Sequence, residues 1–92
     1  MIASWNGQIL AQSDDVIIVE NNAYFPKNSL EMAFFETSNT TSVCPWKGDA
    51  NYFSVTVNGE KNEDCAWYYV SPKEAAMEIK NHVAFWKGVS VE

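Results

Sequence analysis

Positively charged residues are scarce in this sequence of 92 residues, where Lys and Arg together number six and Asp and Glu number twelve. The net charge is −6 at pH 7, and no basic residues cluster anywhere along the chain. Such a surface repels a phosphate backbone, so we expect no nucleic acid among the partners. The acidic residues are scattered, which is typical of a solubilising surface and not of an interaction tail.

Long apolar runs are also absent. No stretch approaches the roughly 18 apolar residues that a membrane-spanning helix needs. Residues 1–5 do not form a charged segment followed by an apolar one, as a secretory leader would. We therefore expect no membrane association and a cytoplasmic location.

Cysteine and histidine are few. Cys44 and Cys65 cannot form a disulfide framework, and with only His82 beside them they cannot supply the four ligands of a structural zinc site. We expect two free thiols in a reducing cytosol and no zinc or other metal, and the sequence leaves the cofactor unknown.

Aromatic residues, in contrast, are abundant. Four Trp, four Tyr and five Phe are more than packing alone usually needs in a chain of one-domain size, so residues 1–92 are expected to form a single domain with a ligand-binding face.

Apolar residues recur at every second position, and turn signals follow one another every eight to twelve residues or so, which is typical of an all-β domain. Asn-Gly pairs readily adopt the positive φ angles of a type I′ hairpin turn. The sequence predicts hairpins around Asn6-Gly7, Asn21-Asn22 and Asn58-Gly59, the last joining strands at residues 51–57 and 64–70 near the centre of the sheet.

Two middle segments are less regular. Residues 30–35 fit one face of a strand or of a helix, and we expect a strand because the run is short and has no cap. Residues 37–45 are rich in Ser, Thr and Asn, which predicts a loop leading into the next strand.

The C-terminal part begins with a helix signal. Ser71 as N-cap, Pro72 at the first helical position and Glu74 as the capping-box partner predict a short helix around residues 72–80. Asn81 suits its C-terminal end, and a final strand is expected over residues 82–86.

Three segments together resemble the family catalogued as domain of unknown function 427: residues 44–48 (Cys-Pro-Trp-Lys-Gly), Asp64 with residues 66–69, and residues 83–86 (Val-Ala-Phe-Trp). The resemblance implies a mainly β fold similar to the β-tent, in which two antiparallel sheets meet at an angle. Relatives of that architecture often bind zinc or small molecules, but the zinc-type cysteine pairs are absent here. The family is sometimes labelled nucleotidyltransferase-like, yet this sequence has neither a Gly-rich phosphate loop nor a paired-carboxylate metal motif.

The aromatic residues near these segments suggest a ligand pocket. Trp46, Trp67, Tyr69 and Trp86 could form a concave wall between the sheets, with Lys47 and Asp64 as polar contacts and the 44–48 loop as a gate. Alternatively these rings are simply core, although alternation along a strand places Trp67 and Tyr69 on one face and Tyr68 on the other.

Cys44 is the candidate nucleophile, since Lys47 nearby would favour its thiolate, with Asp64 or His82 handling protons. The alternative is an inert, buried cysteine and a structural or solvated His82.

Three functions are therefore open. The leading hypothesis is a module that binds an unknown small molecule in an aromatic pocket. The others are an enzyme that uses Cys44 and a structural or protein-interaction module, as a monomer or weak homo-oligomer; whether the chain is catalytic stays undecided.

Overall fold

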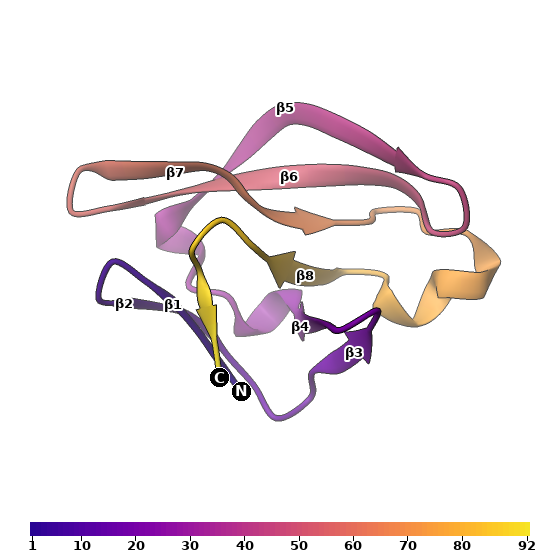
Figure 1. The fold of residues 1–92 in the computed structure, drawn as a ribbon, viewed down its shortest axis with the longest axis horizontal. Helices are drawn as coiled ribbons and strands as arrows, with labels where there is room; N and C mark the ends of the chain where they lie inside the picture. Colours follow the sequence, from indigo (N-terminus) through magenta and orange to yellow (C-terminus); the bar gives the residue numbers. More distant parts are fainter.

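Nine β-strands and three short 3₁₀ helices make up the computed structural model, which describes all of residues 1–92 (Figure 1). The strands are β1 (Ile2–Trp5), β2 (Gln8–Gln12), β3 (Ile17–Val19), β4 (Asn22–Pro26), β5 (Phe35–Cys44), β6 (Gly48–Val57), β7 (Glu60–Tyr68), β8 (His82–Phe85) and β9 (Ser90–Val91). The 3₁₀ helices are η1 (Lys27–Ser29), η2 (Met32–Phe34) and η3 (Glu74–Ile79). No helix in the chain has the length and apolar character that crossing a membrane requires.

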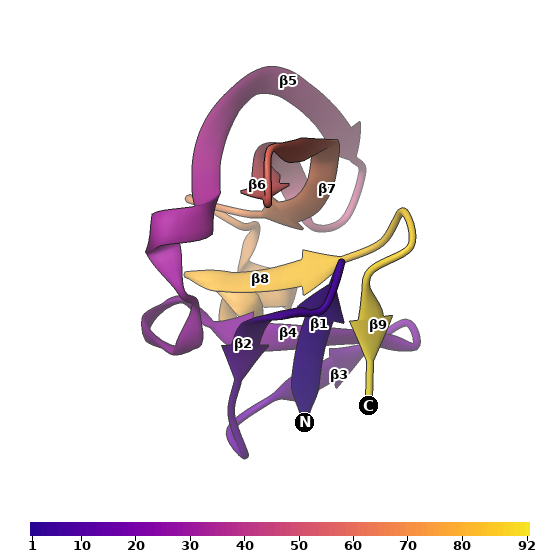
Figure 2. The same ribbon diagram turned by 90° about the vertical axis from the view of Figure 1, so that its left-hand side faces the viewer.

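The strands form two antiparallel sheets, which confirms the predicted fold class. The larger sheet has the order β3-β4-β8-β7-β6-β5 and the smaller one the order β2-β1-β9. Figure 2 shows the strands of the small sheet running across the direction of β4 and β8, with both chain termini in the small sheet. The β6–β7 hairpin lies inside the larger sheet, as predicted.

The Asn-Gly turns form where they were predicted. Asn6 and Gly7 have φ angles of 51° and 76°, and Asn58 and Gly59 have 51° and 78°, so both pairs adopt the left-handed geometry of tight hairpins. The turn between β3 and β4 lies one residue earlier than predicted, because Glu20 and not Asn22 adopts the positive φ angle, of 53°.

Two predictions for the middle of the chain were wrong. Residues 30–35 do not form a strand: Leu30 makes only an isolated bridge to Ala11, and the 3₁₀ helix η2 then turns the chain away from the small sheet. Residues 37–44 are not part of a loop but most of β5, an edge strand with a bulge between Thr37 and Thr41, and only Pro45 lies in the turn that follows. The Ser, Thr and Asn residues there reflect the exposure of that edge strand.

The C-terminal prediction was right in position and partly wrong in detail. The helical segment has 3₁₀ geometry, begins after Lys73 and lacks a side-chain cap, so the Ser71 capping box does not form. The backbone amide of Lys73 instead donates to the carbonyl of Lys47, at 2.8 Å, which fixes the helix start against the β5–β6 turn. The strand after it, β8, is not the last, because β9 returns to the small sheet.

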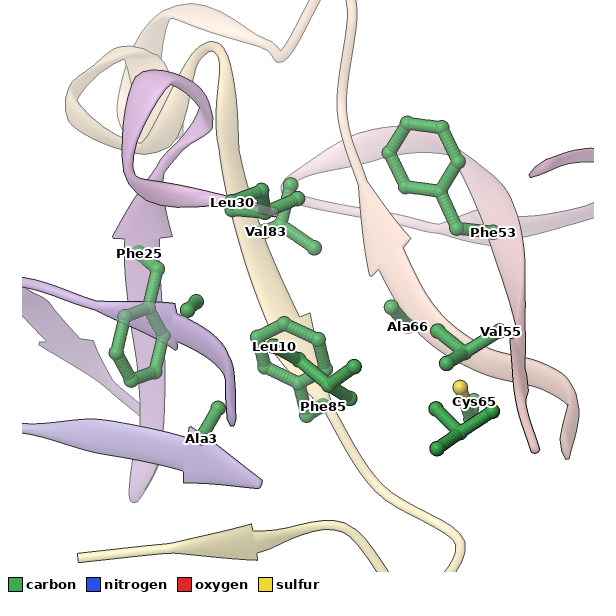
Figure 3. Packing of buried hydrophobic residues seen from close by; sticks show 12 residues of the cluster. Ala3, Leu10, Phe25, Leu30, Phe53, Val55, Cys65, Ala66, Val83 and Phe85 are labelled. Carbon is green, nitrogen blue, oxygen red and sulfur yellow. The ribbon is translucent and has the colours of Figure 1, made fainter. Parts of the chain in front are cut away.

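Both faces of the larger sheet are packed. Twelve buried residues fill the space between the two sheets, among them Leu10, Phe25 and Phe85 (Figure 3). A second buried cluster lies on the opposite face, against η3, and consists of Tyr24, Ala50, Tyr69, Ala76, Ile79 and Ala84. The larger sheet therefore has a second, independent packing surface.

Gly48 provides a test of this arrangement. Its φ angle of +113° lies well outside the left-handed region near +57°, whereas Gly59 has +78°, closer to that region. The nearest atom to an added Cβ at Gly48 is the carbonyl oxygen of Ser71, at 3.5 Å, so the cost of a side chain there is mainly conformational. We expect Gly48→Ala to lower the free energy of unfolding by about 1 kcal/mol or more, and by more than Gly59→Ala does. Urea denaturation measures both, and equal losses would contradict this account of β6.

Candidate functional site

An open pocket of about 230 Å³ lies on the η3 side of the larger sheet. Its lining consists of Lys47, Tyr52, Trp67, Tyr69 and Trp86. Strand pairing explains part of this grouping, because Tyr52 on β6 lies opposite Trp67 on β7, and Trp67 lies opposite Ala84 on β8. Ala84 has only a methyl side chain, so no large side chain from β8 fills the space beside the Trp67 ring at this position.

Trp67 is held in place by two other aromatic rings. It meets Tyr24 edge to face at a centroid distance of 6.2 Å, and its indole nitrogen donates to the Tyr24 hydroxyl at 3.2 Å. Trp86 meets the same ring edge to face at 6.0 Å. Contacts of this geometry stabilise aromatic pairs beyond the area that they bury, so they hold the Trp67 ring in a fixed orientation.

Trp86 is positioned by the backbone of β7. Its indole nitrogen donates to the carbonyl oxygen of Asp64 at 2.6 Å, and the ammonium of Lys87 lies 5.0 Å from its ring. Asp64 has a φ angle of +57°, and its own amide donates to the Ser54 hydroxyl at 3.0 Å. This left-handed bulge presents the carbonyl to Trp86, which remains 47% exposed at the pocket rim.

Lys47 provides the one charged group in the pocket lining. Its side chain is only 8% exposed and forms an ion pair with Glu20 in the turn between β3 and β4. The ammonium also lies 5.2 Å from the centre of the Trp46 ring and 5.9 Å from that of Tyr69. The β5–β6 turn thus delivers a cation to a site that is otherwise aromatic.

The surroundings keep this cation charged. Burial by itself lowers the pKa of Lys47, but the hydrogen bond to Glu20 and the neighbouring Tyr24 and Tyr69 outweigh it, so the pKa is raised overall. The bond to Lys47 lowers the pKa of Glu20, with a smaller contribution from the Trp46 indole. Burial raises the pKa of Tyr69 to about 12, so its hydroxyl is protonated at neutral pH.

Four of the six predicted ligand-binding residues line this pocket: Lys47, Trp67, Tyr69 and Trp86. Trp46 lies beside Lys47 but not in the lining. Sequence reasoning missed Tyr52, because an unbroken hairpin register from Val57 and Glu60 would place it opposite Cys65, and only the bulge between Phe53 and Val55 moves it opposite Trp67. The prediction that the pocket lies between the sheets was wrong. Trp67 and Tyr69 project away from the small sheet, whereas Tyr68 packs on Phe53 in the core between the two sheets.

Asp64 does not contribute its carboxylate to the pocket. That group accepts a hydrogen bond of 2.8 Å from the Thr40 hydroxyl, across β6, and the Ser38 and Thr40 hydroxyls lower its pKa. Lys47 pairs with Glu20 and not with Asp64. The Asp64 carboxylate meets Thr40 because bulges in β5 and β7 bring these two residues together above Ser54. No local sequence pattern predicts such bulges.

Cys44 has no basic partner in this structure. It is half-buried at the end of β5, where it packs against the cluster under η3, and it takes part in no hydrogen bond with a side chain. The Nδ1 atom of His82 lies 2.8 Å from the carbonyl oxygen of Lys80. Nowhere in the chain do three His, Cys, Asp or Glu side chains gather in an arrangement that could hold a metal ion.

The sequence model of one family matches the whole chain. The family is described as "Domain of unknown function (DUF427)", and the match covers residues 1–92. No curated protein matches the sequence.

The ion pair of Lys47 and Glu20 predicts a pH-dependent stability difference. Since folding lowers the pKa of Glu20, the pair stabilises the fold fully above pH 4.5, the ordinary pKa of a Glu side chain. This stabilisation is lost as the pH falls through the lower pKa that Glu20 has in the folded state. Since folding raises the pKa of Lys47, the stabilisation is complete below pH 10.5, the ordinary pKa of a Lys side chain. It is lost as the pH rises through the higher pKa that Lys47 has in the folded state. Glu20→Gln should therefore lower Tm at neutral pH and have much less effect well below pH 4.5.

Glu36→Gln is the matched control, because Glu36 forms the other ion pair, with Lys61, and both of those side chains are at least half exposed. Exposed pairs contribute little to stability, so its Tm should change less than that of Glu20→Gln. Thermal denaturation of the two variants at several pH values measures both effects. An effect of Glu20→Gln that stays constant down to strong acid would contradict the assignment of the pair.

The two cysteines should differ in reactivity. Cys65 is fully buried, and this burial raises the pKa of its thiol to about 11, so we expect no reaction with an aromatic disulfide reagent in the folded protein. Any native reactivity should belong to Cys44 and disappear in Cys44→Ser, while unfolding in urea exposes both thiols. Reaction of Cys65 at a comparable rate in the native state would show that this core opens.

The pH dependence of alkylation at Cys44 tests its role as a nucleophile.

Proposed function

We propose that this chain, which belongs to the DUF427 family, is a binding module for a small, flat organic molecule that enters the pocket of Tyr52, Trp67, Tyr69 and Trp86 beside Lys47. The observation that carries the proposal is the nearly buried side chain of Lys47, a charged residue in an otherwise aromatic pocket. A few polar groups set among aromatic walls are typical of small-molecule sites.

Stability alone is a poor reason for this placement of Lys47. A buried charge is costly unless it is well paired, and replacing such a pair with apolar residues is often neutral or stabilising. Here the partner, Glu20, is half exposed, so the pair is not enclosed. A binding role accounts for a lysine that is kept charged, with little of its side chain exposed, in the lining of a cleft.

The aromatic rings support the same conclusion. Trp86 is 47% exposed although Trp67 and the Asp64 carbonyl fix its orientation. Holding a large ring rigid and half wet costs side-chain entropy and leaves apolar surface in water. A planar ligand that covers the ring buries this apolar surface, and it does not have to order the ring when it binds.

The size of the pocket limits the ligand. A cavity of about 150 Å³ is large enough for benzene, and pockets for drug-sized molecules begin at roughly 300 Å³. The value of about 230 Å³ falls between these limits. The proposed ligand therefore has one or two rings with small substituents.

Two other hypotheses receive less support. Catalysis by Cys44 lacks a hydrogen-bonded base, and the single histidine makes its contact elsewhere. A role in protein association would use an exposed edge such as β5, but the bulge in that strand works against regular pairing. The pocket combines aromatic walls with a charged side chain that is only 8% exposed.

Binding can be tested by NMR with a panel of one- and two-ring compounds. We expect hits to shift the indole N–H resonances of Trp67 and Trp86 and to leave that of Trp5 unchanged, because Trp5 packs on the other face of the sheet. Trp86→Ala should weaken binding about tenfold, the loss expected for one stacking contact of about 1.4 kcal/mol.

Val43→Ala is the matched control, since Val43 is exposed, apolar and outside the pocket lining. It should leave the affinity of every hit unchanged. If no compound of any charge shifts the Trp67 or Trp86 resonance at millimolar concentration, the proposal fails.

A further inference from the structure

Lys47 has a single polar partner for an ammonium group that can donate three hydrogen bonds. That partner is the Glu20 carboxylate, and the other close neighbours are the rings of Trp46 and Tyr69. The Lys47 side chain as a whole is only 8% exposed, so it offers little surface to water. Its hydrogen-bonding capacity is therefore only partly used in the pocket.

Glu20 is a half-exposed counter-ion. It lies at the tip of the β3–β4 hairpin with a φ angle of +53°, a conformation that residues other than Gly, Asn and Asp seldom adopt. Its side chain is 53% exposed, and β3 is a strand of three residues that pairs only with β4. Glu20 can therefore rotate into water without leaving a buried carboxylate behind.

Glu20 is also absent from the pocket lining. It approaches Lys47 from the β3–β4 turn, while Tyr52, Trp67 and Trp86 belong to β6, β7 and the segment after β8. A ligand in the pocket thus reaches the same ammonium without having to occupy the position of the Glu20 backbone.

The charge of the ligand follows from these contacts. An incoming cation would meet the charged Lys47, which already lies against Trp46 and Tyr69 in the manner of a bound ammonium. A neutral ring would leave the ion pair unchanged and gain only stacking. A carboxylate gains a charge-assisted hydrogen bond to a lysine whose side chain is only 8% exposed.

We infer that the pocket selects small aromatic carboxylates, and that the carboxylate of the ligand takes the place of Glu20 on Lys47. This inference rests on the proposed function, because it names the ligand class of the same pocket. Glu20 then acts as an internal competitor that occupies the cation until a ligand binds.

Matched ligand pairs provide the test. Benzoate is compared with benzamide, and indole-3-acetate with indole-3-acetamide, by titration of the Trp67 and Trp86 indole resonances. In the unmodified protein each carboxylate should bind about tenfold or more tightly than its amide, because only the carboxylate is itself charged, and a hydrogen bond between two ionised groups is stronger than one to a neutral amide oxygen. Benzyltrimethylammonium serves as the cationic ligand and should bind most weakly.

The variants separate competition from net charge. Glu20→Gln should raise the affinity for the carboxylates several-fold and leave the amides unchanged, because it removes the competitor. Glu36→Gln makes the same charge change at the other ion pair, with Lys61, and should have no such effect. Lys47→Met keeps the unbranched stem and should abolish the preference for carboxylates, with thermal denaturation to verify that each variant is folded.

Each failure has a distinct signature. Equal binding of acid and amide, or weaker carboxylate binding by Glu20→Gln, would overturn the inference while the pocket itself still binds ligands. Tight binding of benzyltrimethylammonium that Glu20→Gln abolishes would make the site a cation receptor. Absence of any resonance shift with all of these ligands would overturn the proposed function together with the inference.

Discussion

The alternation of side chains along β7 is the constraint on which this structure depends. Tyr68 faces the small sheet and stacks on Phe53 at 4.5 Å, while Trp67 and Tyr69, the residue just after the strand, face the opposite side. Because successive residues of a strand point to opposite faces, one run of three aromatic residues serves both the core and the pocket. A shift of one residue in the pairing of β7 would exchange the two roles.

Lys47 connects the elements around the pocket. Its backbone carbonyl accepts from the amide of Lys73 at the start of η3, and its side chain pairs with Glu20 from the β3–β4 turn. Gly48 follows it with a φ angle of +113°, which lets β6 begin close to residues 71–73. A single tight turn therefore fixes the helix that covers one face of the sheet and places the charge beside the aromatic rings.

Asp64 shows how a residue in a shared motif can act through its backbone. Its carboxylate is bound to Thr40 on β5, away from the pocket, while its carbonyl oxygen accepts from the indole of Trp86. The left-handed conformation that orients this carbonyl is one that Asp tolerates better than most residues. Asp64 thus contributes to the geometry of the pocket rim without lining it.

Local chemistry by itself determined much of this protein. Asn-Gly pairs set two hairpins, the period of two indicated a mainly β fold, and alternation placed Trp67 apart from Tyr68. These features depend on residues close together in the chain. Tertiary structure alone decided that Lys47 pairs with Glu20, that Thr40 bonds to Asp64, that residues 37–44 form an edge strand, and that the open face lies away from the small sheet. These outcomes require the order and register of strands that are distant in sequence, which local patterns do not encode.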